Sequence, residues 1–373
     1  MKGSIVSLTA FLAVLPFALV LGEGAPEKML EIGEQAPDFS LPGVDGKTYS
    51  LKDFAGARIL AVIFTCNHCP TAQAYENRIK KLVADYKEKG VAFVAISPND
   101  PEAVRLDELG YTDLSDSFEE MKIRAKERSF NFPYLYDGET QKVSRAYGPT
   151  ATPQLFLFDA GRKLRYVGRI DDSERENLAK THEARDAMEA VLSDKAPAVE
   201  KTKTFGCSIK WSDKRDSVKQ SLVKAKAHEV TLESIGPDAL RKLVSGKSDK
   251  LRVINVWATW CGSCVVEFPE LVTIQRMYGH RAFELVTVSA DQPDQKEKVL
   301  AFLKKMEAPS RNYQFELTDK DKLFSAVDEK WSGAIPYTIV VRPSGEIVYR
   351  RMSQIDPLEL RREIVKNLAD DRS

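Results

Sequence analysis

The sequence predicts an α/β protein with two three-layer sandwiches in succession, each built on a mixed central β-sheet flanked by helices. Short apolar runs with strand character alternate with stretches of helical periodicity. Each half of the chain ends in a hairpin pattern and a closing helix, so the second half repeats the order of elements of the first. The 373 residues are enough for two domains that each bury a core of their own.

The first half starts with a hairpin around the turn Asp45-Gly46-Lys47 and continues into a buried strand. The helix after that strand has apolar residues at helical spacing and stops at Gly90. We expect strands at 59–64, 91–96, 134–136, 154–158 and 164–168, and helices at 70–90, 112–128, 142–147 and 183–192. These elements make a first domain over residues 28–194.

The pattern restarts in the second half and predicts a second domain over residues 230–373. We expect strands at 251–258, 283–290, 337–341 and 347–350, and helices at 240–244, 267–278, 295–306 and 358–368. Residues 195–229 are rich in Lys and poor in large apolar side chains, which is typical of a linker. Within this linker, the segment 206–211 around Cys207 is more apolar than a plain connection, and 213–226 has the pattern of a solvated helix.

The N-terminal segment differs from the rest of the chain. Lys2 precedes an apolar run over residues 5–21, so residues 1–24 resemble a signal peptide, with an uncleaved membrane anchor as the alternative. We therefore expect an exported protein, periplasmic or otherwise extracytoplasmic, that meets a membrane only through this segment if it stays uncleaved. Lys plus Arg and Asp plus Glu both number 55, which argues against nucleic acid as a partner.

The five cysteines are too few for a disulfide scaffold and fall into two close pairs and a single residue. In the segment 253–264 an apolar strand leads into Trp260 and the pair Cys261 and Cys264, and a helix follows. The order of strand, paired thiols and helix suits dithiol–disulfide exchange, because the helix start stabilises a thiolate. A weaker copy of this order holds Cys66 and Cys69.

In each pair we expect the first cysteine to attack a substrate disulfide and the second to resolve the mixed disulfide. Cys66 and Cys261 are then the nucleophiles. His68 stands between the cysteines of the first pair, where a protonated imidazole would stabilise the Cys66 thiolate. We therefore predict that the first pair is the more oxidising one. Cys207 is either a buried free thiol or a relay or resolving thiol.

Other uses of the cysteines stay open. Zinc needs four ligands, and the chain has four His in all, so neither pair is expected to hold it. Copper bound by Cys66, His68 and Cys69 is an alternative, since thiolates and imidazole suit that metal. Either pair could also be a structural disulfide. We expect no resident cofactor and no resident metal.

The second domain resembles the TlpA-like thiol–disulfide oxidoreductases through the segment 257–264, Glu267 and Pro269, and the loop 333–338. The first domain resembles the AhpC/TSA redoxins through the opening 33–39, the loop 151–154 and the segment 206–211. The resemblance implies the thioredoxin fold twice. It also implies cis peptides at Pro153 and Pro336, beside the sulfurs, where an extended substrate would pair.

Two departures from these families bear on mechanism. AhpC/TSA peroxidases place Pro and Thr at set distances before the peroxidatic Cys, and the residues before Cys66 lack that spacing. Thioredoxins carry a buried acid six residues before the first Cys, where this chain has Leu60 and Asn255. Glu267, one helical turn after Cys264, is a candidate substitute for that acid.

The sequence therefore predicts an exported thiol–disulfide oxidoreductase acting through two CxxC centres. Its expected partners are exported proteins that bear disulfides and a membrane dithiol that donates electrons. One alternative is an antioxidant thiol peroxidase in which the second domain recycles the first. A second alternative is a module that binds or delivers copper.

Overall fold

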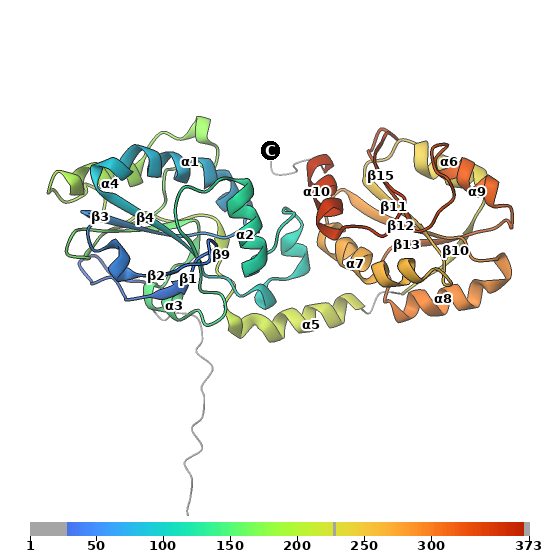
Figure 1. Cartoon of the computed structure of the whole chain (residues 1–373), viewed down its shortest axis with the longest axis horizontal. Coiled ribbons are helices and arrows are strands. Elements are labelled where there is room, and N and C mark those ends of the chain that lie inside the picture. The colour runs from blue at the N-terminus through green and yellow to red at the C-terminus, as the bar shows by residue number, and fades with distance from the viewer. Residues whose placement is uncertain (1–27, 227–228, 369–373) are drawn as a thin grey trace, which may run out of the picture.

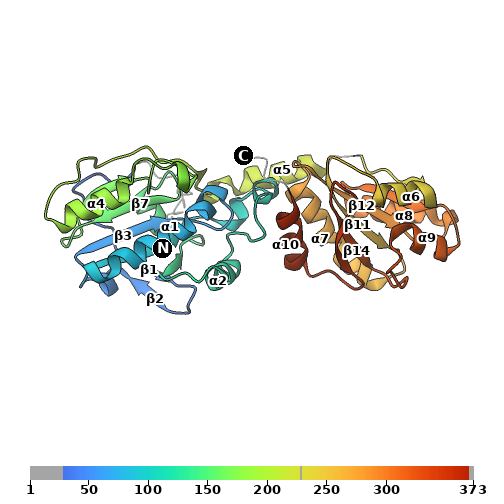
Figure 2. The same cartoon turned by 90° about the horizontal axis from the view of Figure 1, so that it is seen from above.

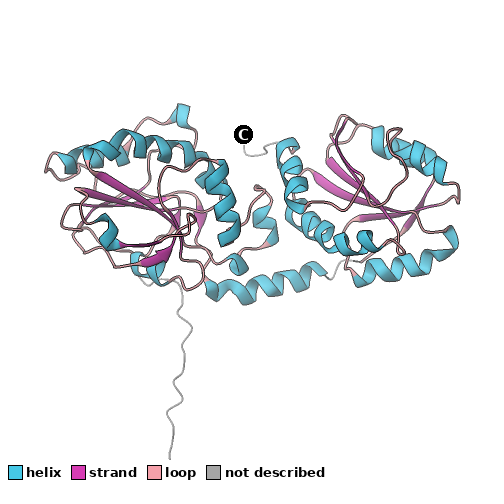
Figure 3. Cartoon of the chain, viewed as in Figure 1, coloured by secondary structure: helices cyan, strands magenta, loops and turns pink. Residues whose placement is uncertain are grey.

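The computed structural model describes residues 28–226 and 229–368, and it shows two α/β sandwiches side by side along the chain (Figures 1 and 2). The predicted fold class is confirmed: each sandwich has a mixed sheet between helical layers (Figure 3). The predicted signal or anchor segment, 1–24, lies outside the described residues. Within the described ranges, no helix combines the length and apolar character needed to cross a bilayer.

The sheet of the first domain is centred on β3 (Ile59–Phe64). Its order is β5-β4-β3-β7-β8, with β5 (Tyr134–Tyr136), β4 (Val91–Ser97), β7 (Gln154–Phe158) and β8 (Leu164–Gly168). β3 is parallel to β4 and antiparallel to β7. Both faces of β3 are buried, which explains why it is apolar throughout.

Helices cover one face of this sheet and a hairpin with a short helix covers the other. Ile59, Ala61 and Ile63 share a core with α1 (Pro70–Tyr86), α2 (Phe118–Glu127) and α4 (Glu183–Leu192). Leu60 and Val62 point to the opposite core, which includes α3 (Lys142–Tyr147) and the hairpin. That hairpin is β1 (Ser40–Pro42) and β2 (Thr48–Ser50), and it leads into the 3-10 turn η1 (Leu51–Phe54).

The second domain repeats this plan around β11 (Leu251–Trp257). The sheet order is β10-β13-β12-β11-β14-β15, with β10 (Glu233–Ile235), β13 (Arg311–Phe315), β12 (Phe283–Ser289), β14 (Tyr337–Val341) and β15 (Ile347–Arg351). α7 (Gly262–Tyr278) and α10 (Pro357–Asn367) share one core with β11, and α6 (Pro237–Ser245) and α9 (Lys320–Val327) share the other. α8 (Lys296–Lys305) packs beside Trp257 and α7.

Most predicted elements are confirmed, and the differences have local causes. Three elements of the second domain were not predicted: β10, β13 and α9. The reason is plain for the two strands, since β10 is short and the β13 sequence is largely polar. The helix predicted at 112–128 is wrong in its first part: α2 begins at Phe118, where the Ser117 hydroxyl caps the N–H of Glu120. α7 begins at Gly262 rather than at 267.

The segment 195–229 serves only in part as the predicted linker. α5 (Arg215–Lys226) runs between the two sandwiches (Figure 1). Upstream of it, the chain folds back on the first domain: Thr202 N–H donates to the Val167 carbonyl at 3.1 Å. β9 (Cys207–Ser208) then pairs with β6 (Ala151–Thr152). The first domain therefore continues past residue 194 and includes the segment 206–211, as its resemblance to the redoxins implies.

The two domains touch through the loop 104–117 and α2 on one side and α7 and α10 on the other. Tyr278 donates to the Thr112 carbonyl at 2.7 Å, and Arg361 pairs with Glu120 at 2.8 Å. Val104 and Leu109 of the first domain enter the core beneath α7. The contact thus joins an apolar patch to hydrogen bonds and ion pairs.

Candidate functional site

In the second domain, Cys261 and Cys264 form a disulfide at the start of α7, with an S–S distance of 2.12 Å. Cys261 is the N-cap of the helix, and its sulfur accepts the N–H of Cys264 at 3.3 Å. Cys261 is 7% exposed and Cys264 is fully buried, which is the arrangement expected of an attacking and a resolving thiol. We call this pair centre two.

Cys261 lies beside a cis-proline loop and an exposed tryptophan. The carbonyl of Ile335 lies 3.7 Å from the Cys261 sulfur, and the Ile335–Pro336 peptide is cis, as the resemblance implied. Trp260 is 58% exposed at the mouth of the site, and the Lys320 ammonium lies 5.5 Å from its ring centre. Trp260 and the loop before Pro336 thus flank Cys261, the less buried of the two sulfurs.

Centre two contains a buried acid, supplied by α7. Glu267 accepts hydrogen bonds from the Asn255 amide at 2.9 Å and from the Ile355 N–H at 2.8 Å. Burial raises the pKa of the Glu267 carboxyl, and the two hydrogen bonds only partly offset that effect. Asn255, at the position where thioredoxins carry the acid, instead holds Glu267 in place. Glu267 as the substitute acid, one helical turn after Cys264 in the sequence, stays a prediction.

In the first domain, the helix begins at the second cysteine of the pair. Pro70 is the first residue of α1, so Cys69 is its N-cap and its sulfur accepts the Ala72 N–H at 3.4 Å. Cys69 therefore holds the place on α1 that Cys261 holds on α7. Cys66 lies three residues upstream, with its sulfur 3.2 Å from the Thr152 hydroxyl. We call Cys66 and Cys69 centre one.

The predicted order of the two thiols in centre one has Cys66 as the nucleophile, whereas the surroundings of the two sulfurs favour ionisation of Cys69. Burial disfavours ionisation of both, and it raises the pKa of Cys66 well above its usual range. For Cys69 burial is outweighed by hydrogen bonds from the Cys207 and Cys66 thiols and from the Ala72 N–H, which with the charge of His68 hold its pKa well below the usual range. The Thr152 carbonyl lies 3.3 Å from the Cys69 sulfur and opposes this effect. A carbonyl oxygen accepts a hydrogen bond from the protonated thiol but cannot bond to the thiolate. Cys69, not Cys66, is the favoured thiolate.

His68 forms a buried pair with Asp116, a residue that the sequence did not single out. His68 Nδ1 lies 2.5 Å from Asp116 Oδ2 and 3.6 Å from the Cys66 sulfur. Asp116 also accepts from the backbone N–H groups of Asn67 and His68 and from the Asn99 amide. Burial opposes the charge on His68, but Asp116 raises the His68 pKa. Asp116 lies 48 residues away in a loop predicted as helix, so no local signal marked it.

The same cluster bears on the alternative of a copper site. The ligand atoms of Cys66, His68 and Asp116 lie within 4.8 Å of one another. This set differs from the predicted Cys66, His68 and Cys69. His68 Nδ1 and Asp116 Oδ2 already bond to each other, so a metal would have to replace that ion pair. A metal site here stays a prediction without added support.

The structure brings the remaining predicted residues of the first domain to centre one. The Thr152–Pro153 peptide is cis, as implied. Cys207 lies against Cys69 and donates its N–H to the Cys69 sulfur at 3.4 Å. Centre one is thus a cluster of three thiols, in which Cys66 is 3% exposed and Cys69 is fully buried.

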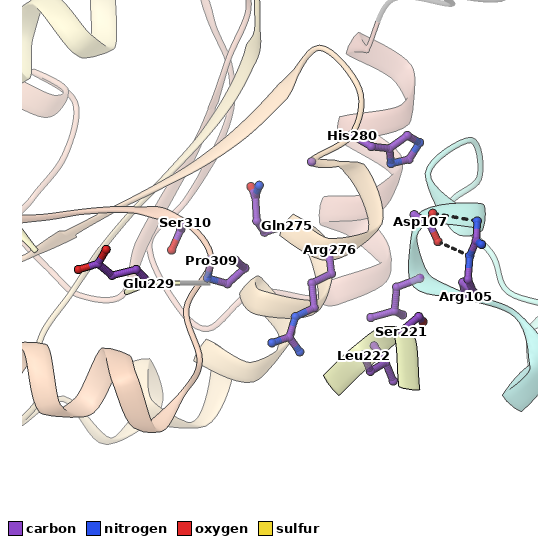
Figure 4. Close-up of a pocket in the computed structure, with 12 residues that line it drawn as sticks. Arg105, Asp107, Ser221, Leu222, Glu229, Gln275, Arg276, His280, Pro309 and Ser310 are labelled. Atoms are coloured by element: carbon purple, nitrogen blue, oxygen red, sulfur yellow. Dashed lines mark hydrogen bonds and ion pairs between the residues drawn. The ribbon is translucent and has the colours of Figure 1, made fainter. Parts of the chain in front are cut away.

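A cavity of about 620 Å³ lies at the domain junction, away from both centres (Figure 4). It is lined from α5, α7 and the loop that holds Arg105 and Asp107, which pair with each other. His280 and Arg276 face it from the second domain. None of the five cysteines is among the described residues that line this cavity.

A sequence model described as the AhpC/TSA family matches residues 32–167 and 223–350. The chain belongs to the AhpC/TSA family. Two relatives are named thiol-disulfide oxidoreductase ResA. That of Bacillus thuringiensis subsp. konkukian is 27% identical over 43% of this chain and 82% of its own length. That of Bacillus cereus is 29% identical over 40% of this chain and 75% of its own length.

Two solved structures are also similar. A hypothetical protein of Sinorhizobium meliloti 1021 is 34% identical over 50% of this chain and 97% of its own, with a TM-score of 0.44. An uncharacterized conserved protein of Geobacillus kaustophilus is 38% identical over 49% of this chain and 94% of its own, also with a TM-score of 0.44. The family and the ResA relatives confirm the prediction of a thioredoxin-like thiol–disulfide oxidoreductase.

Replacing Glu267 with Gln tests the buried acid. The folded protein holds the Glu267 proton more tightly than the unfolded chain does, so this group lowers the free energy of unfolding as pH rises from the usual Glu range through the raised pKa. Glu267→Gln has no carboxyl group at this position, so it lacks this pH-dependent part of the free energy of unfolding. It also loses one hydrogen bond, at a cost of about 1 kcal/mol. The stability advantage of the wild-type protein over the variant should therefore shrink as pH rises, measured by urea unfolding at several pH values.

Glu270→Gln is the matched control for this experiment, because Glu270 lies on the same helix and is exposed. Its stability difference from the wild-type protein should stay flat with pH. A flat difference for Glu267→Gln as well would contradict a raised pKa at Glu267.

Replacing Asp116 with Asn tests the support of the Cys69 thiolate. The loss of the carboxylate should lower the pKa of His68, and with less positive charge nearby the pKa of Cys69 should rise. The measurement is the alkylation rate of Cys69 against pH, followed by peptide mass spectrometry. Asp113→Asn is the control, since Asp113 pairs with Arg124 and Arg362 instead. An unchanged Cys69 profile in Asp116→Asn would refute this role.

Proposed function

We propose that the protein is exported and carries out dithiol–disulfide exchange through both CxxC centres, on disulfides of other exported proteins. The observation that carries the proposal is the Cys261–Cys264 disulfide at the start of α7, with the outer sulfur beside the carbonyl before Pro336. The N-terminal pattern over residues 1–24 supports export. A membrane dithiol is the proposed electron donor, because exported proteins have no free access to NADPH.

In the reduced form of centre two, the Cys261 thiolate attacks a substrate disulfide and forms a mixed disulfide with one substrate sulfur. The other substrate sulfur leaves as a thiolate and takes up a proton. Cys264 then gives up its proton and attacks the Cys261 sulfur, which releases the second substrate thiol. Two electrons and two protons pass to the substrate, and the Cys261–Cys264 disulfide forms. Glu267 is the proposed acceptor of the Cys264 proton.

The peroxidase alternative gains no support at centre one. A peroxidatic cysteine must reach peroxide as a thiolate, and burial raises the pKa of Cys66. The spacing of Pro and Thr before Cys66 is also missing. Peroxide consumption by the purified protein that is lost in Cys66→Ser would revive this alternative.

Serine variants of centre two test the exchange reaction. Cys261→Ser should reduce insulin disulfides no faster than background, because the Cys264 thiol is fully buried and the Cys66 and Cys69 thiols of centre one are enclosed. Cys264→Ser should instead accumulate mixed disulfides through Cys261, detected on non-reducing gels and identified by mass spectrometry. The control is the double variant Cys66→Ser and Cys69→Ser, which should keep insulin reduction. If Cys264→Ser traps no partner, exchange through centre two is refuted.

The two centres should also differ in reduction potential. The donated hydrogen bonds and His68 stabilise the Cys69 thiolate, and a stabilised thiolate favours the reduced form. Centre one should therefore be more oxidising than centre two by at least about 30 mV, a tenfold change in the equilibrium constant. Equilibration with glutathione buffers followed by mass mapping measures both centres in one sample. A less oxidising centre one would contradict the assignment.

A further inference from the structure

A segment of the chain itself lies across centre one. β9 runs antiparallel to β6, with Cys207 opposite Thr152, the residue before Pro153. Gly206 has φ +133°, and a Cβ added there would lie 2.0 Å from the Thr152 carbonyl oxygen. Only glycine lets the two backbones approach this closely. In the thioredoxin fold an extended substrate is expected to pair along this edge, so β9 takes the place of a substrate.

The segment is held on both sides of β9. Before it, the Arg169 N–H donates to the Thr202 hydroxyl at 2.9 Å. After it, the Lys210 N–H donates to the Asn99 side chain at 2.9 Å, and Ile209 and Trp211 are buried. β9 is therefore a fixed part of the first domain rather than a strand of passing linker.

The cover changes which sulfur a partner can reach. Cys66 is 3% exposed and Cys69 is fully buried, whereas Cys207 is only partly buried. The Cys207 N–H donates to the Cys69 sulfur at 3.4 Å, and the two thiols share a hydrogen bond. Among the three sulfurs of centre one, Cys207 is both the outermost and a direct neighbour of Cys69.

We propose that Cys207 is the exchanging thiol of centre one: it receives the disulfide from Cys66 and Cys69 and presents it to a partner dithiol as a Cys69–Cys207 disulfide. This inference rests on the proposed function and names the residue through which the first domain meets its partner. The partner class is a protein with a pair of accessible thiols.

The exchange balances within the cluster. The Cys207 thiol gives up its proton and attacks the Cys69 sulfur of the Cys66–Cys69 disulfide. The Cys66–Cys69 bond breaks, and Cys66 leaves as a thiolate and takes up one proton, so no net electrons move. The Cys207 proton passes to solvent, and a protonated His68, with Nδ1 3.6 Å from the Cys66 sulfur, is placed to supply the proton that Cys66 takes up.

The partner then reduces the relocated disulfide. A partner thiolate attacks Cys207, the Cys69–Cys207 bond breaks, and Cys69 leaves as a thiolate. The second partner thiol attacks the mixed disulfide, which frees Cys207 and leaves the partner oxidised by two electrons. Cys69 suits its role as leaving group, because donated hydrogen bonds hold its pKa well below the usual range despite its burial.

The hydrogen bond to Cys69, together with burial and the charge of that thiolate, raises the pKa of Cys207. Once Cys69 is in a disulfide, its hydrogen bond and its charge are gone, while the nearby Lys210 still favours ionisation of Cys207. Cys207 therefore becomes easier to ionise in the oxidised form, which is when the exchange needs it.

Disulfide mapping of the full chain tests the proposal. The protein is equilibrated with oxidised glutathione, blocked with N-ethylmaleimide and cut with trypsin. Cys66 and Cys69 share the tryptic peptide 59–78, and Cys207 lies in the peptide 204–210. A Cys69–Cys207 disulfide therefore cross-links two peptides, and a Cys66–Cys69 disulfide does not. We expect the cross-link in the wild-type protein and in Cys66→Ser.

Two outcomes overturn the proposal in distinguishable ways. If the wild-type protein forms a Cys66–Cys69 disulfide, but neither it nor Cys66→Ser shows the cross-link, the role of Cys207 is refuted and the proposed function stands. If no disulfide forms among the three cysteines while Cys261–Cys264 is oxidised, exchange at centre one fails as well.

The rate at which glutathione reduces oxidised centre one is the second measurement. In Cys207→Ser only the two enclosed sulfurs remain, so reduction should be about tenfold slower than in the wild-type protein. Ser208→Ala, the exposed neighbour on β9, should keep the wild-type rate and controls for disturbance of the strand. Reduction of Cys207→Ser at the wild-type rate would refute the proposal.

Discussion

Both redox centres depend on the unpaired N–H groups at the start of a helix. The first turn of an α-helix has N–H groups without partners inside the helix, and they are directed at whatever precedes it. In α7 the donor is the N–H of Cys264 and the acceptor is the Cys261 sulfur; in α1 the Ala72 N–H serves the Cys69 sulfur. A buried strand delivers the chain to that point in each domain, so the sheet and helix together place one sulfur in each centre.

The two centres use this shared arrangement in opposite ways. Centre two lies beside an exposed Trp260, and the buried acid of its helix, Glu267, is bonded to Asn255 in the core. Centre one is covered by β9, and its charged groups, His68 and Asp116, stand beside the sulfurs. One domain thus combines an outer sulfur next to an exposed aromatic ring with a buried acid, and the other combines a covering strand with a stabilised thiolate. This difference is the physical ground for assigning unlike roles to two copies of one fold.

The contact between the domains reaches toward centre one. Arg361 of α10 pairs with Glu120, which accepts from the Ser115 N–H, and the Ser115 carbonyl accepts from the Asn67 side chain at 2.8 Å. Asn67 stands between Cys66 and His68 in the sequence. The loop that supplies Asp116 is therefore fixed by the second domain on one side and by centre one on the other.

The sequence by itself determined the α/β class, the duplication and both CxxC pairs, because these are written in local patterns: buried strands as apolar runs, helices as periodicity, and the thiols as close pairs. Tertiary structure alone decided the partners of those thiols. Asp116 and Cys207 reach centre one from 48 and 138 residues away, across turns whose geometry no local pattern encodes. The order of reactivity in centre one was equally out of reach, since it depends on Pro70 starting the helix at Cys69 and on the hydrogen bonds that gather at that sulfur. The position of a thiol in the sequence shows that it can react. Its ionisation and its accessibility depend on the hydrogen-bond donors and the covering strand that folding brings to it.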